Sequence, residues 1–115
     1  MYLFEKEDDY NNVEYKIHIK RLNKYSIHHH LAQIQYRVTE GYGIAYYLIG
    51  IRDNGEVVGL NNSSYKKSLT NIYKLVYALH YTVPIILSCL YKGKRFIIAK
   101  IKSNIDISEL PYFII

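Results

Sequence analysis

The 115 residues have the length of a single domain (1–115), and with half of them hydrophobic and 22% charged they can form one core without structural metals. The 15 Lys and Arg residues exceed the 10 Asp and Glu residues, and the resulting net charge of +5 favours an anionic partner. A lone cysteine, Cys89, excludes internal disulfides, and the sequence has neither a signal peptide nor an apolar run near the ~18 residues of a membrane span, so we expect a cytoplasmic protein with no membrane partner.

The first third of the chain predicts an arm, a strand and a helix. Residues 1–12 are acidic and irregular, and we expect a mobile arm or one that a partner orders. In residues 13–21 apolar and polar residues alternate, which predicts a strand with Val13 and Tyr15 facing the core and Glu14 and Lys16 facing solvent. Apolar residues then recur at helical spacing from Ser26, a candidate N-cap, to a stop at Gly41.

The middle of the chain predicts a hairpin and a second helix. The continuous apolar run 42–52 is typical of a central strand, and Asp53-Asn54-Gly55 forms a turn because Asn and Gly tolerate positive φ. Residues 56–60 return as a short strand, and the rigid tip is suited to docking against RNA and protein. A helix begins at Ser63 or Ser64.

Two further strands, 83–91 and 95–103, are joined by a turn at Lys92-Gly93-Lys94, and residues 105–115 form an apolar tail. The predicted order is therefore β-α-β-β-α-β-β. We predict an α/β (α+β) fold with one mixed sheet and two helices packed on it.

Several short motifs in residues 13–80 resemble the N-terminal module of eukaryotic elongation-factor-like GTPases, the GTP-binding-protein subfamily related to elongation factor 1A. That module has a Glu-Tyr-Lys strand, a Gln-x-x-x-Arg helix, a glycine-flanked strand and an Asp-Asn-Gly-x-x-x-Gly-Leu hairpin. The matching residues here are Glu14, Tyr15 and Lys16; Gln33 and Arg37; Glu40, Gly41, Gly43, Ala45, Tyr47, Ile49 and Gly50; and Asp53, Asn54, Gly55, Gly59 and Leu60.

The resemblance implies a role near tRNA and the ribosome. No Gly-x-x-x-x-Gly-Lys-Ser/Thr phosphate loop occurs in the sequence, so we expect a stand-alone, monomeric module that is not an enzyme and takes no cofactor, nucleotides included. Such a basic module is similar to the small ribosome dormancy factors of microsporidia, which occupy a tRNA site of idle ribosomes. The expected partners are therefore the ribosome, its rRNA and its proteins, and the expected role is ribosome hibernation, a form of translation regulation.

Basic residues in projecting segments are the candidate RNA contacts, because Lys and Arg provide salt-sensitive affinity for phosphates. Three adjacent histidines at a helix start cannot converge on one metal ion, so a role in RNA binding is favoured for them, and we expect no metal site. The candidate RNA-binding residues are Lys20, Arg21, Lys24, His28, His29, Arg37, Lys66, Lys67, Lys92, Lys94 and Arg95.

Two alternatives remain open from the sequence. The hairpin also resembles that of Schlafen-type nucleic-acid domains, and Asp9, Glu14 and Asp53 match the spacing of the three acids that hold a divalent metal in their endoribonuclease members. In the other alternative the chain is an adaptor that binds a protein through the apolar tail.

Overall fold

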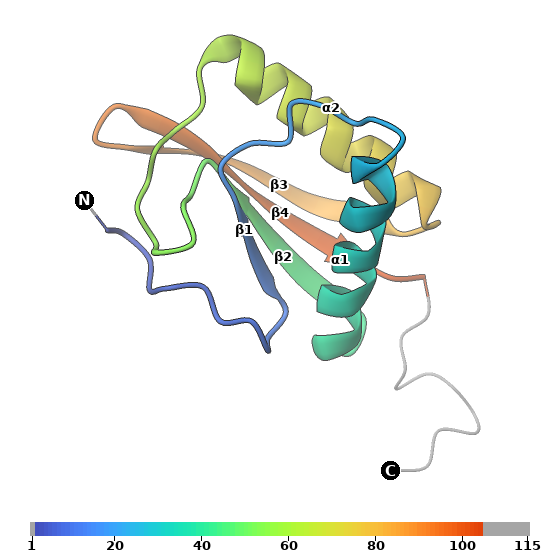
Figure 1. Cartoon of the computed structure of the whole chain (residues 1–115). Coiled ribbons are helices and arrows are strands. Elements are labelled where there is room, and N and C mark those ends of the chain that lie inside the picture. The colour runs from blue at the N-terminus through green and yellow to red at the C-terminus, as the bar shows by residue number, and fades with distance from the viewer. Residues whose placement is uncertain (1, 105–115) are drawn as a thin grey trace.

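The structure is a computed structural model that describes residues 2–104. Its fold confirms the predicted fold class (Figure 1). The elements run β1 (Val13–Lys16), α1 (Ser26–Glu40), β2 (Ile44–Ile49), α2 (Asn62–Ala78), β3 (Thr82–Tyr91) and β4 (Lys94–Lys102). The strands form one mixed sheet of order β1-β2-β4-β3, in which β1 is parallel to β2 and the other neighbours are antiparallel. The predicted tail, 105–115, lies outside the described residues.

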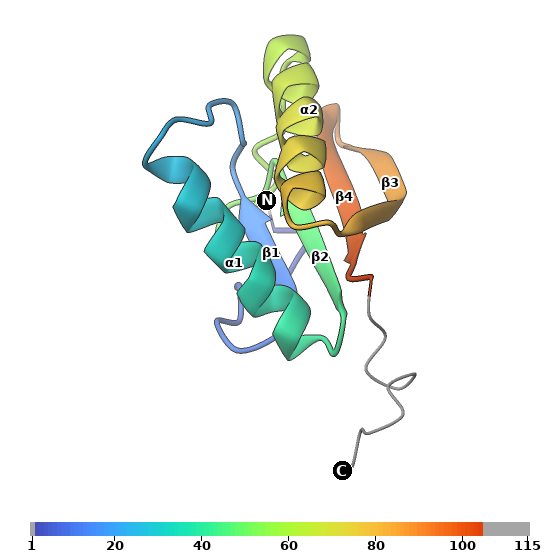
Figure 2. The same cartoon turned by 90° about the vertical axis from the view of Figure 1, so that its right-hand side faces the viewer.

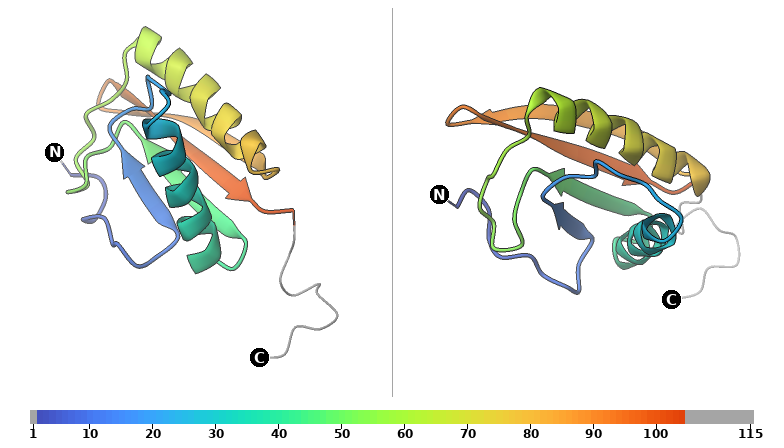
Figure 3. Two further views of the ribbon diagram at one scale, coloured as in Figure 1. Left: turned by 45° about the vertical axis from the view of Figure 1, so that its right-hand side comes forward. Right: turned by 45° about the horizontal axis from the view of Figure 1, so that its top comes forward.

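The main hydrophobic core lies between the sheet and the two helices (Figure 2). Tyr47 and Ile49 of β2 contribute to it from the sheet, and Ile34 of α1 and Ile72 of α2 contribute from the helices. The two views of Figure 3 show α1 beside β1 and β2, and α2 beside β3 and β4. Strand β2 is an interior strand, since it lies between β1 and β4, and both of its faces are covered. Its continuous apolar sequence predicts this position.

A second, smaller core covers the opposite face of the sheet around Tyr15, Leu48 and Phe96. Phe4 of the N-terminal arm packs against it, with its ring centroid 5.7 Å from that of Phe96. The arm is irregular, but the expectation of a mobile or partner-ordered arm is wrong. Its contacts are with the chain itself.

The predicted hairpin 42–60 is present in a reduced form. Strand β2 ends at Ile49, and the returning segment makes isolated bridges, between Ile51 and Val57 and between Tyr2 and Glu56. The tip does not project for docking, since the arm runs along it. The amide of Phe4 donates to the carbonyl of Gly55 at 3.3 Å, and that of Glu7 to the carbonyl of Asp53 at 2.7 Å.

The helix ends follow ordinary capping chemistry. Asn61 caps α2, because its side chain accepts a hydrogen bond from the amide of Ser64 at 2.8 Å. At α1 the expected Ser26 cap is not observed, since Tyr25 occupies the N-cap position without a side-chain cap bond. The side-chain oxygen of Asn23, just before the helix, accepts from the amides of Tyr25 and Ser26 instead. Helix α1 ends at Gly41, as predicted.

Candidate nucleic-acid interface

The loop from residue 17 to 25, between β1 and α1, carries the first predicted basic cluster and is anchored to α2 at Ile19. The Ile19 side chain is buried, its amide donates to Oγ of Ser68 at 2.9 Å, and its carbonyl accepts from the side-chain amide of Asn71 at 2.8 Å. Both backbone groups of this residue are therefore satisfied by one helix. The anchor holds Lys20 and Arg21, which are exposed, beside α2.

Two hollows adjoin this anchored loop, and Lys20 and Arg21 line both of them. The first has a volume of about 370 Å³ and is lined by His18, Ile19, Lys20, Arg21 and His30. The second has a volume of about 650 Å³ and is lined by Lys20, Arg21, Leu22, Asn23, Ile27, Asn71 and Lys74. We call the two together the α2 groove. Its cationic side chains, with no carboxylate among the lining residues that the structure describes, suit a phosphate-bearing ligand.

The surroundings of two histidines in the first hollow lower their pKa values. Burial lowers the pKa of His30, and the positive charge of Lys16 lowers it further. Burial and Lys20 likewise lower the pKa of His18. Both imidazoles are thus neutral at neutral pH, when they both donate and accept hydrogen bonds. Among the described residues nothing forms a hydrogen bond with the buried Nδ1 of His30.

A second basic cluster forms where the start of α2 meets the β3–β4 turn. The guanidinium of Arg95 lies 4.6 Å from the ring centroid of Tyr65 and donates to the side chain of Asn62 at 3.1 Å. Four exposed lysines surround this junction, on the first turns of α2 and on the turn: Lys66, Lys67, Lys92 and Lys94. Lys67 and Lys74 are seven residues apart on α2, so they share a face about 10 Å apart and connect this cluster with the α2 groove.

Three of the other predicted RNA contacts lie near the groove but do not line it. Lys24, His28 and His29 are exposed around the start of α1, close in sequence to the groove but outside its lining. Of the three adjacent histidines favoured for RNA binding, His30 lines the first hollow. Sequence reasoning missed His18, Asn71 and Lys74 as site residues. Asn71 and Lys74 lie on α2, and although helical spacing places Lys74 on the polar side of that helix, no local pattern brings α2 next to the loop before α1.

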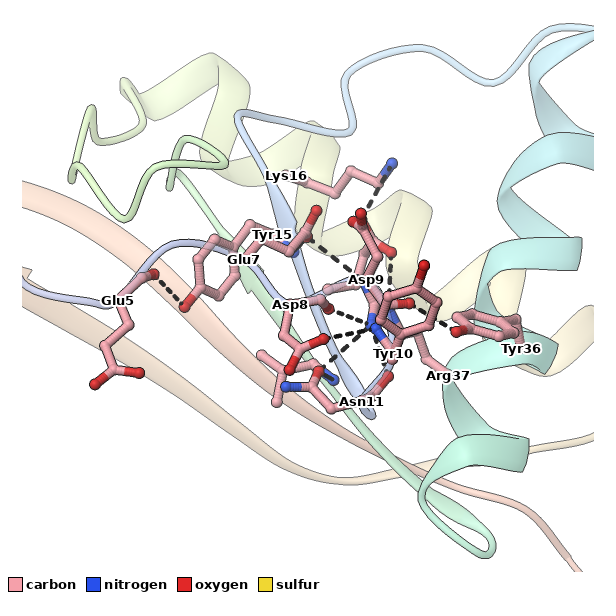
Figure 4. Close-up of polar contacts among 12 residues, drawn as sticks. Glu5, Glu7, Asp8, Asp9, Tyr10, Asn11, Tyr15, Lys16, Tyr36 and Arg37 are labelled. Atoms are coloured by element: carbon pink, nitrogen blue, oxygen red, sulfur yellow. Dashed lines mark hydrogen bonds and ion pairs between the residues drawn. The ribbon is translucent and has the colours of Figure 1, made fainter.

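One predicted RNA contact is wrong, because Arg37 is buried inside the protein, with 3% of its surface exposed (Figure 4). Its Nε lies 3.0 Å from Oε1 of Glu14, and its Nη1 donates to the carbonyls of Asp8 at 2.8 Å and Asn11 at 2.6 Å. Glu14 was expected on the solvent side of its strand, yet it is buried on the helix side because α1 covers that face. Arg37 therefore ties the arm, β1 and α1 together.

Glu7 of the arm completes this network, which we call the Arg37 network. One of its carboxylate oxygens accepts a hydrogen bond from the amide of Tyr15, and it lies 3.8 Å from Nη2 of Arg37. Burial, with a smaller contribution from the charge of Glu14, raises the pKa of Glu7 to about 7 against the opposing hydrogen bond from Tyr15. Glu7 is thus about half protonated near neutral pH.

The three acids of the endoribonuclease alternative do not form a metal site. Glu14 forms an ion pair with Arg37, whereas Asp9 and Asp53 are exposed. The backbone carbonyl of Asp9 accepts a hydrogen bond from the hydroxyl of Tyr36, and that of Asp53 accepts one from the amide of Glu7. Within residues 2–104 there is no group of three or more His, Cys, Asp or Glu residues that could hold a metal ion. The geometry gives this alternative no support. The adaptor alternative rests on the tail, outside the described residues.

The fold and the groove define a class: a small α+β domain of net positive charge with a groove lined by cationic side chains beside a helix. No helix among the described residues has the length and apolarity to cross a membrane. No family model matches the chain, and no solved structure matches it.

The chain is similar to GTP-binding protein 2 of mouse (Mus musculus) and of human (Homo sapiens), with 37% identity over 71 residues in each case. The match covers 62% of this chain and 12% of either relative, so the chain corresponds to a small part of those proteins. The expectations of a protein that is not an enzyme and takes no nucleotide are wrong on this finding. It connects the chain to proteins named for binding GTP, and proteins of that kind commonly hydrolyse the nucleotide.

Proposed function

We propose that this chain is the RNA-contacting part of a GTP-binding protein that acts in translation, and that it binds ribosomal RNA through the α2 groove. The proposed place is a tRNA site, and the resemblance to dormancy factors favours idle ribosomes, in the cytoplasm, as the particles bound. The observation that carries the proposal is that Lys20 and Arg21 line both hollows.

The groove suits an RNA backbone better than a small molecule. Its two hollows share a wall, and exposed Lys67 and Lys74 extend the positive surface along α2 towards Lys94 at the turn. A linear series of separated cations matches the repeated phosphates of a nucleic-acid strand, and each contact releases a counterion. Exposed Tyr25, beside the groove in sequence, offers a ring on which an unpaired base can stack.

The relatives are named for binding GTP. We propose that RNA binding by this domain is used by a GTP-binding protein, so that the nucleotide and the RNA act on the same particle. Binding to ribosomes is therefore best measured with no nucleotide, with GDP and with GTP. An effect of nucleotide on affinity would support a common function.

The proposal is tested by co-sedimentation of the protein with purified ribosomes over a series of salt concentrations. Lys20→Ala/Arg21→Ala removes two groove cations, and the plot of log affinity against log salt should lose about 1.4 from its slope, at about 0.7 for each contact with single-stranded RNA. Lys6→Ala/Lys102→Ala is the matched control, because it removes the same charge from exposed positions outside the groove. Equal losses in both double variants would show that net charge, not the groove, governs binding.

A further inference from the structure

Strand β3 is an edge strand with an exposed apolar surface. Within the described sheet it has a neighbour, β4, on one side only. Alternate residues of an antiparallel strand bond to one neighbour, so every second residue of β3 directs its N–H and C=O groups away from β4. Three of its large side chains are exposed: Ile85 at 45%, Leu87 at 50% and Leu90 at 74%. Such an edge is a template for another strand.

The opposite edge of the sheet lacks this character. Strand β1 has only four residues, and the carboxylate of Glu7 accepts from the amide of Tyr15 beside it. Short edge strands and covering segments are ordinary protections against association. The irregularity between Thr82 and Ile85, which contains Pro84, protects the start of β3 in the same way. Within residues 2–104 the unprotected part of β3 is therefore 85–91.

We propose that segment 85–91 pairs antiparallel with the same segment of a second copy of this chain, to form a two-fold dimer with a continuous sheet. The segment is bounded by the irregularity at one end and by the Lys92-Gly93 turn at the other, and its middle residue is Ser88. A two-fold axis at Ser88 pairs the whole segment with itself and leaves Pro84 outside. This inference is independent of RNA binding, and it replaces the monomer expected from the sequence.

The absence of charge from segment 85–91 favours a second copy of this chain as its pairing partner. Segment 85–91 contains no charged residue in a chain of net charge +5, so two copies can approach there without opposing like charges. The basic strand β4 and its counterpart would lie three strand spacings apart, or about 14 Å. That distance exceeds the Debye length of about 8 Å at physiological ionic strength, so their repulsion is largely screened.

The proposed register also covers the exposed side chains. With the axis at Ser88, Leu90 lies opposite Ile86 of the second copy, Leu87 opposite Cys89, and Ile85 opposite Tyr91. Each exposed apolar residue thus gains an apolar or aromatic cross-strand neighbour, the kind of pair that stabilises a sheet. The segment matches the composition of strands that pair with themselves, since it is apolar, uncharged and free of Pro.

Sedimentation velocity over a dilution series of the full chain tests the association. Wild type should show a reversible rise to twice the monomer mass, and Leu90→Lys should remain a monomer, because a charge at an edge position opposes pairing. Leu90 is largely exposed, so the substitution should leave the melting temperature of the monomer unchanged. Tyr10→Lys is the control, since Tyr10 is 82% exposed and lies in the arm, and it should dimerise as wild type does. A wild type that stays monomeric throughout the series overturns the proposal.

A disulfide tests the register. Residues directly opposite in a hydrogen-bonded antiparallel pair have Cα atoms about 5.5 Å apart, within the ~4.4–6.8 Å range of disulfides. In a Cys89→Ser background, Ser88→Cys should therefore form a covalent dimer with oxidised glutathione, and Tyr10→Cys should not. Dimers in sedimentation without crosslinking at position 88 overturn the axis at Ser88, and equal crosslinking at both positions indicates random collision.

Discussion

Ser68 on α2 offers a direct test of how the fold positions the groove. Its side chain is fully buried, and its hydroxyl oxygen accepts the hydrogen bond from the amide of Ile19 at 2.9 Å. Ser68→Ala leaves that amide buried without an acceptor, which costs about 1–3 kcal/mol. The higher helix propensity of Ala returns about 0.5 kcal/mol. The net loss in the free energy of unfolding should therefore be about 0.5–2.5 kcal/mol.

A matched control separates the hydrogen bond from helix propensity. Ser63 lies on the same helix but is exposed, so Ser63→Ala makes the same chemical change without removing the anchor. Urea denaturation gives both values, and their difference should be about 1–3 kcal/mol, the cost of the unpaired amide. The midpoints should shift while the slopes stay equal, because the surface exposed on unfolding is unchanged.

The same variant should weaken RNA binding without a change in charge. When the loop is released, Lys20 and Arg21 are no longer held in place before RNA binds. The free-energy cost of ordering them on binding then lowers the affinity. The salt dependence should keep its slope while the affinity falls, whereas Lys20→Ala/Arg21→Ala should change both. If Ser68→Ala and Ser63→Ala unfold at the same urea concentration, the Ile19 anchor has no energetic role and the reasoning is refuted.

Three further variants test the Arg37 network and the arm. Arg37→Met should lower the free energy of unfolding by about 3–5 kcal/mol in urea denaturation, since Glu14 stays buried without its partner, and a loss under about 1 kcal/mol would contradict this. Wild type should lose stability as pH rises from about 4.5 to about 7, because folded Glu7 keeps its proton above its ordinary pKa. In thermal melts across that pH range Glu7→Gln should show a smaller loss, and a loss equal to that of wild type excludes Glu7 as the source. Gly55→Ala should cost about 1–3 kcal/mol in thermal melts, since φ is +94° and the new Cβ would lie 1.9 Å from the carbonyl oxygen of Phe4, whereas a wild-type melting temperature would mean that the arm detaches freely.

The sequence by itself determined the kinds of element and the main turns. Helical spacing located both helices, the continuous apolar run of β2 indicated an interior strand, and Gly41 marked the end of α1. These features depend on local physics: side-chain periodicity, backbone freedom at glycine and the hydrogen-bonding needs of helix ends. The same local reasoning predicted a solvated face for Glu14, and there it failed, because one strand does not reveal which of its faces a helix will cover.

Only the tertiary structure decided which charges are available. Arg37 and Lys20 have the same formal charge, but Arg37 lies under the arm against Glu14, while Lys20 stands in a groove. The groove itself combines a loop with α2 about fifty residues away, so Asn71 and Lys74 enter it without a signal in their neighbours. The exposed edge of β3 likewise follows from strand order. Burial and pairing depend on contacts between distant segments, and for that reason composition predicted a basic protein without locating its basic site.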